Sequence, residues 1–156
     1  MALIDDFLTA INAYPYPADN VEIDIVNFSG GGGHINAGEI WNFQVRVANK
    51  GKLDMKNLDL RIYGSEWATV SKSSFPILFR SLISTEKKDL DAHSAVTFGS
   101  FYMRAVQATG SGSLIDENLV SVHIRSYDVG LNHIVNDHEH HANNPIANYS
   151  RRIYPS

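Results

Sequence analysis

The chain of 156 residues is 44% hydrophobic and 19% charged, and its formal net charge is −4. These values predict one globular domain over residues 1–156 and exclude a disordered chain. The acidic balance argues against a general nucleic-acid binder. Cysteine is absent, which excludes disulfide scaffolds, thiol catalysis and cysteine-ligated zinc. No apolar run approaches the roughly 20 residues of a membrane-spanning helix, so we expect no membrane insertion.

Apolar residues near the start of the chain recur at helical spacing. They are Leu3, Ile4, Phe7, Leu8 and Ile11, which would share one face of a helix. We expect a short N-terminal α-helix over residues 1–14, ended by the prolines of residues 15–17. This helix either packs over one end of the domain or serves as a dimerisation or docking helix. No secretion signal opens the chain, which predicts a cytoplasmic protein, and a domain excised from a secreted protein would give the same pattern.

The rest of the chain alternates between apolar and polar residues, which is the period of a half-buried strand. The alternating stretches are residues 21–25, 41–47, 58–62, 96–105, 120–124 and 131–135, with a short addition at 69–70. A change of phase predicts a β-bulge near Gly99, and Pro76 argues against a central strand in the ambiguous apolar stretch 75–84. About seven short strands predict an all-β, antiparallel β-sandwich, with a small barrel as the alternative.

Several short stretches resemble one family of β-sandwich modules. Residues 35–39 read Ile-Asn-Ala-Gly-Glu, residues 47–51 read Val-Ala-Asn-Lys-Gly, residues 90–94 read Leu-Asp-Ala-His-Ser, and residues 128–144 carry a spaced series of Asp, Asn and Glu. In this order they resemble the CARDB-like domain, a bacterial immunoglobulin-like module, over about residues 20–144. The resemblance implies an immunoglobulin-like sandwich of seven strands. The helix in front, the histidines near the end and a C-terminal tail at 145–156 depart from that family.

Histidines gather near the C-terminus at His133, His138, His140 and His141. Imidazole is a good ligand for divalent metals such as Zn²⁺ or Ni²⁺, and residues two apart in an extended strand point the same way. The spacing matches no specific metal motif. The stretch is therefore either a metal site, a solvated polar loop, or a group that senses pH near the ordinary histidine pKa.

Four other residues are candidate ligand or partner contacts: His34, Trp67, Tyr149 and Tyr154. His34 follows the glycine run 30–33, which lacks the Lys-Ser/Thr of a phosphate loop and reads as a loop between strands or a partner-binding loop. An exposed Trp67 could stack on a sugar, whereas Trp41 is expected to be buried. The tyrosines lie in the predicted tail, which is either free or packed on the same or a neighbouring subunit.

No catalytic residue set stands out in the sequence. A Gly-x-Ser-x-Gly elbow is absent, and the paired carboxylates sit where solvation explains them. We therefore expect a protein that is not an enzyme and needs no cofactor. The sequence favours a binding or assembly module that acts through protein–protein contacts and forms a homo-oligomer, because open sandwich edges invite pairing. The alternatives are a metal-binding protein and a carbohydrate-binding β-sandwich.

Overall fold

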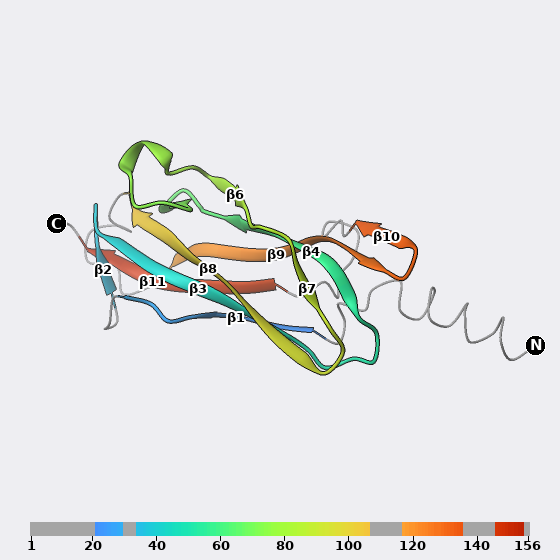
Figure 1. Ribbon diagram of the computed structural model, residues 1–156. Coiled ribbons are helices and arrows are strands. Elements are labelled where there is room, and N and C mark those ends of the chain that lie inside the picture. The colour runs from blue at the N-terminus through green and yellow to red at the C-terminus, as the bar shows by residue number, and fades with distance from the viewer. Residues whose placement is uncertain (1–20, 30–33, 107–116, 136–145, 155–156) are drawn as a thin grey trace, which may run out of the picture.

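The computed structural model describes residues 21–29, 34–106, 117–135 and 146–154. These residues form eleven strands and one short 3₁₀ helix (Figure 1). The elements are β1 (Val21–Val26), β2 (His34–Asn36), β3 (Ile40–Asn49), β4 (Met55–Tyr63), β5 (Ala68–Ser71), η3 (Pro76–Leu78), β6 (Leu82–Ser84), β7 (Lys88–Leu90), β8 (Ser94–Ala105), β9 (Glu117–Val129), β10 (Asn132–Val135) and β11 (Ile146–Tyr154). The helix predicted for residues 1–14 lies outside the described part of the chain.

The strands form two sheets that pack face to face (Figure 1). One sheet has the order β1-β3-β8-β5, and the other has the order β2-β11-β9-β4-β6, with β10 paired to β9 and β7 paired to β4. The pairings are antiparallel except for β2 with β11, which run parallel. The predicted all-β, antiparallel sandwich is thus confirmed. The described strands exceed the predicted seven because three short strands, β2, β6 and β7, give little signal in a sequence and because β11 was taken for a tail.

The alternating pattern of β3 explains how the core forms. Trp41, Phe43, Val45 and Val47 are at most 3% exposed, while the residues between them face outward. Burying a side chain of this size stabilises the fold by roughly 1.5–3 kcal/mol. The expectation that Trp41 is buried is confirmed, and its indole Nε1 donates a hydrogen bond to the carboxylate of Glu39. Inward residues from both sheets complete one continuous core.

The predicted bulge near Gly99 is also confirmed. The register of β3 with β8 shifts between Phe43 and Val45, so that Phe98 and Phe101 both face the core although they are three positions apart. Gly99 has a φ of 124°, which side chains rarely adopt. A Cβ at this position would lie 3.2 Å from the carbonyl oxygen of Phe43. The bulge therefore depends on glycine.

The segment that the sequence assigned to a C-terminal tail is corrected by the structure. Residues Ile146–Tyr154 form β11, which lies between β9 and β2 inside the larger sheet. Its residues Ala147, Tyr149 and Ile153 are buried, at 8%, 8% and 1% exposure. Because polar residues separate these inward side chains, the stretch reads as a polar tail when taken by itself. No helix in the described ranges is long and apolar enough to cross a membrane.

Candidate functional site

The predicted histidine cluster falls only partly within the described residues. His133 is exposed on β10, and its Nδ1 lies 2.6 Å from Oδ1 of Asp128 on β9. His138, His140 and His141 lie outside the described residues. Within the part of the chain that is described, no three or more His, Asp or Glu side chains are grouped so that they could hold a metal ion. A zinc or nickel site therefore stays a prediction.

Asp128 connects strands of the larger sheet through its side chain. Nδ2 of Asn57 donates to Oδ2 of Asp128 at 2.8 Å, and the backbone N–H of Asn57 donates to Oδ1 of Asp89 at 3.0 Å. The hydrogen bond with Asn57, which has the larger effect, and the one with His133 hold the pKa of Asp128 below its usual value. Asn57 has a φ of 53°, which asparagine tolerates better than most residues. The network ties the β9–β10 hairpin to β4 and β7.

His34 and Tyr154 lie in the parallel pair of β2 and β11. In this register His34 is opposite Arg152, and Tyr154 is opposite Asn36. The structure describes these two candidates by their backbone alone. The pairing thus brings His34 and Tyr154 to one edge of the larger sheet, two residues apart in register. Their role as ligand or partner contacts stays a prediction.

Tyr149 is a core residue of its own chain. It is 8% exposed, and its ring stacks on Phe28 at 3.8 Å between centroids. Trp41 meets the same ring edge-on at 6.4 Å, and Phe28 also stacks on Phe43 at 5.6 Å. This aromatic cluster fastens β11 to β3 across the sandwich. Of the two alternatives for packing, Tyr149 takes the one on its own subunit, and it offers little surface to a ligand.

Trp67 is half-buried just before β5 and packs against the core. Its backbone N–H donates to Oγ of Ser65 at 3.1 Å, and its carbonyl accepts the N–H of Val106 at 2.9 Å. The residue thus fastens the start of β5 to the end of β8. Because part of the indole lies against the core, less of its face is free for a sugar. Sugar binding by Trp67 stays a prediction.

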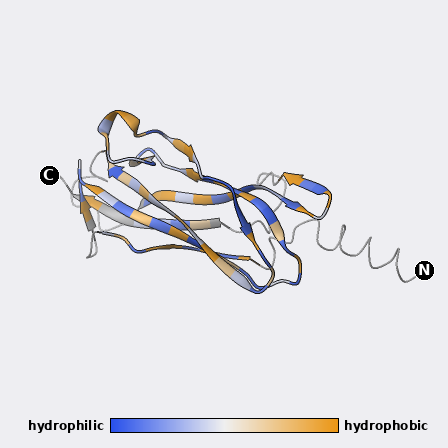
Figure 2. Cartoon of the chain, in the orientation of Figure 1, coloured by the Kyte–Doolittle hydropathy of each residue, from blue (hydrophilic) through white to orange (hydrophobic). Residues whose placement is uncertain are grey.

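An apolar segment protrudes between β5 and β6. Seven large hydrophobic side chains are exposed in the described residues, and four of them come from residues 75–82. Their exposures are 67% for Phe75, 87% for Ile77, 37% for Leu78 and 41% for Leu82. Figure 2 shows the hydrophobic colour along η3 and β6 at the outer side of the molecule. We call residues 75–82 the apolar arm.

The apolar arm is anchored to the body of the protein through its C-terminal half, residues 79–82. Backbone hydrogen bonds of 2.8 Å run in both directions between Val70 and Arg80, and β6 pairs with β4. The guanidinium of Arg104 lies 5.1 Å from the centroid of the Phe79 ring, a cation–π distance. The exposed side chains are therefore presented by a fixed scaffold.

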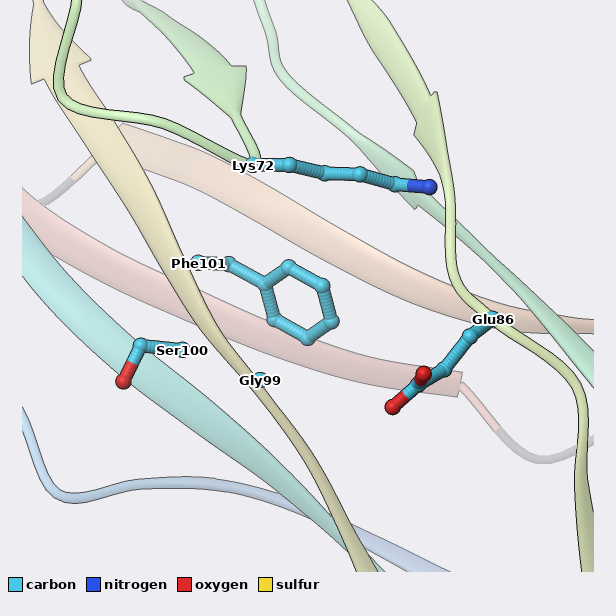
Figure 3. A pocket seen from close by; sticks show the side chains of 5 residues that line it. All are labelled: Lys72, Glu86, Gly99, Ser100 and Phe101. Atoms are coloured by element: carbon cyan, nitrogen blue, oxygen red, sulfur yellow. The ribbon is translucent and has the colours of Figure 1, made fainter.

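A shallow hollow of about 210 Å³ lies at the base of the apolar arm, lined by Lys72, Glu86, Gly99, Ser100 and Phe101. Lys72 follows β5, Glu86 lies between β6 and β7, and the other three form the bulge of β8. Figure 3 shows the Phe101 ring between the side chains of Lys72 and Glu86. We call this hollow the bulge groove.

The charges at the bulge groove are of opposite sign and do not pair with each other. Glu86 Oε1 lies 3.5 Å from Nζ of Lys88, and Lys88 in turn lies 5.8 Å from the centroid of the buried Phe98 ring. Lys72 has no ion pair or hydrogen bond within the described part of the chain. The groove is thus lined by one exposed cation that pairs with none of the described carboxylates.

Comparisons with known proteins find only distant likenesses to solved structures. No protein-family model matches the chain, and no curated protein matches it significantly. The chain is similar to the sporulation control protein Spo0M from Bacillus subtilis, with 11% identity and a TM-score of 0.46 over 86% of this chain and 49% of that one. It therefore spans about half the length of Spo0M.

Two further solved structures are similar over most of their length. AvmM, which catalyses macrocyclisation in alchivemycin A biosynthesis, shares 16% identity with a TM-score of 0.43 over 88% of this chain and 90% of that one. PapD-like domain 7 of human CEP192 shares 11% identity with a TM-score of 0.39 over 90% and 87%. At these identities and scores the likenesses carry no argument about function.

Sequence reasoning left the apolar arm undecided and did not single out the bulge groove. Residues 75–84 were ambiguous because their apolar side chains follow neither the period of a strand nor that of a helix. Lys72 and Glu86 are ordinary surface charges in the sequence, fourteen positions apart. Only the return of the chain from β5 to β6 brings them to the same hollow. The one local signal was the bulge at Gly99, which the change of phase predicted.

Proposed function

We propose that this protein is a non-catalytic binding or assembly module that acts through protein–protein contacts and associates with copies of itself. The observation that carries this proposal is the apolar arm. Soluble proteins rarely present a contiguous apolar patch on a fixed scaffold unless another surface covers it. The arm lies beside β6, an edge strand of the larger sheet, and open edges favour pairing between chains.

A second copy is the partner that this proposal favours, because the open edges of one copy can pair with those of another. Among the described strands, the smaller sheet also ends in one with no outer neighbour, β1, whose outward side chains include Glu22 and Asp24. Contacts between identical surfaces form closed dimers, and contacts between different edges form longer assemblies. Pairing through β6 brings the apolar arm, which runs into that strand, into the contact.

Mutation of the apolar arm tests this proposal. Ile77 is 87% exposed, so Ile77→Asp leaves the core untouched and places a charge in the proposed contact. Leu131→Asp is the matched control, because Leu131 is fully exposed in the turn between β9 and β10, outside the arm. We expect Ile77→Asp to lower the mass in solution and Leu131→Asp to leave it unchanged. Equal masses for both variants and the parent protein would refute the role of the arm.

The fold is further proposed to be immunoglobulin-like and of the CARDB type. Support comes from the two turns that carry the resemblance. Gly38 has a φ of 86° in the turn before β3. Asn49 is 1% exposed, accepts the N–H of Gly51 through Oδ1 at 2.9 Å, and donates to the carbonyl of Leu53 at 2.8 Å. These residues have a conformational role that other side chains would not fill.

A further inference from the structure

The smaller sheet has an open edge beside the bulge groove. Strand β8 lies between β3 and β5, but β5 pairs only with Tyr102–Ala105 and ends at Ser71. From Ser94 to Phe101, β8 has β3 on one side and, within the described residues, no strand on the other. The bulge groove is lined by Gly99, Ser100 and Phe101, the residues of β8 next to those that pair with β5, so it lies at this free edge.

The backbone of β8 is oriented for pairing along that edge. In an antiparallel ladder, alternate residues direct their N–H and C=O groups to opposite neighbours. The backbone N–H of Ala105 donates to the carbonyl of Glu39 on the side of β3, whereas the N–H of Val106 donates to the carbonyl of Trp67 on the side of β5. The bulge at Gly99 shifts this alternation by one residue. The backbone groups of Thr97 and Ala95 therefore face the side that β5 leaves open, and both residues are exposed.

The size and charge of the groove define what fits it. A volume of about 210 Å³ is below the roughly 300–1,000 Å³ of small-molecule pockets, but it accommodates the side chains of a bound chain. Lys72 lines the groove and has no ion pair among the described residues, so its ammonium complements an acidic group. An extended peptide supplies both a backbone that can pair with β8 and an acidic side chain that can contact Lys72.

We propose that the bulge groove and the free edge of β8 bind an extended peptide segment of a partner protein. The peptide pairs its backbone with Thr97 and Ala95 and directs an acidic side chain to Lys72. This is recognition by strand addition, in which main-chain hydrogen bonds supply affinity and side-chain pockets supply specificity. The inference rests on the proposed protein-binding function and does not require self-association.

Peptides selected on the intact protein provide the test. A displayed library of random dodecapeptides is selected against the full chain, and the enriched peptides are synthesised with a fluorescent label. Fluorescence polarisation then compares their affinity for the parent protein, Thr97→Pro and Thr97→Ala. Proline removes the N–H that faces the open side and leaves the ladder with β3 in place, whereas alanine keeps that N–H. We expect about a tenfold loss with proline and no loss with alanine.

Charge reversal tests the second contact. Lys72→Glu is expected to lower the affinity for the enriched peptides about fivefold. A peptide whose acidic residue is changed to lysine is expected to bind this variant with the affinity that was lost. Because Thr97→Pro could unfold the chain, hydrogen exchange of the parent protein is measured as well. Bound peptide should protect the amides of Thr97 and Ala95.

Several results would overturn the inference. The first is a library that enriches no peptide. The second is a peptide affinity that changes with neither Thr97→Pro nor Lys72→Glu. The third is amide protection by bound peptide at residues other than Thr97 and Ala95. The outcome is separate from that of self-association, because Ile77→Asp is expected to change the mass in solution without changing peptide affinity. Peptide binding by a monomeric protein would thus reject self-association and retain the groove.

Discussion

Replacement of Gly99 by alanine is expected to destabilise the fold more than replacement of any other glycine with a positive φ in the described chain. Gly99 has a φ of 124°, and a Cβ there would lie 3.2 Å from the carbonyl oxygen of Phe43 and 3.3 Å from Cδ2 of Phe101. A side chain in such a sparsely populated conformation costs about 1–3 kcal/mol. The lower entropy of the unfolded alanine variant offsets about 0.4–1 kcal/mol of this.

The net loss for Gly99→Ala is therefore about 2 kcal/mol once the crowding against Phe43 is included. For a chain of this length, that loss lowers the melting temperature by roughly 4–8 °C. Urea unfolding followed by tryptophan fluorescence measures the free energy directly. Gly130→Ala is the matched control, because Gly130 has a φ of 58° and nothing lies within 4 Å of the position that a Cβ would take there. Equal losses for the two variants would refute the argument from crowding at the bulge.

The larger sheet and its core give three further predictions. Asp128→Asn should destabilise the protein near neutral pH, because Asn57 and His133 lower the pKa of the Asp128 carboxylate in the folded state. The difference in stability from the parent protein should shrink as the pH falls below the ordinary carboxylate pKa of 3.8. A difference in melting temperature that stays constant down to acid pH would contradict this prediction. Tyr149→Ala should cost about 3–5 kcal/mol in urea unfolding, since it removes a buried ring from the aromatic cluster, and a loss below about 1 kcal/mol would contradict that packing. Deletion of residues 146–156 should prevent folding because it removes β11 from between β9 and β2, and a cooperative thermal transition in the shortened chain would show otherwise.

The sequence predicted the strands whose two faces differ in environment. Trp41, Phe43, Val45 and Val47 alternate without interruption because β3 lies at the centre of its sheet, with one face on the core and one toward water. The phase change at Gly99 was visible for the same reason, since an interruption can be recognised only within a regular pattern.

The sequence did not reveal β11 or the two surface features. Strand β11 is held by the stacking of Tyr149 on Phe28, and by the ladder with β9, and neither contact can be read from residues 146–154 alone. The bulge groove depends on residues that are distant in the sequence and meet only after folding. The apolar arm has no periodicity because its side chains face solvent from a short 3₁₀ helix and a short edge strand.

The mass of the unmodified chain in solution tests the central claim most directly. Sedimentation equilibrium over about a hundredfold range of concentration reports self-association by mass action. The measurement is repeated with a chelator and accompanied by elemental analysis, which addresses the metal-binding alternative. We predict a mass of at least two chains of 17.3 kDa each, unchanged by the chelator. A mass of one chain at every concentration would contradict self-association, and a stoichiometric metal whose removal dissociates the assembly would favour a role for the histidines.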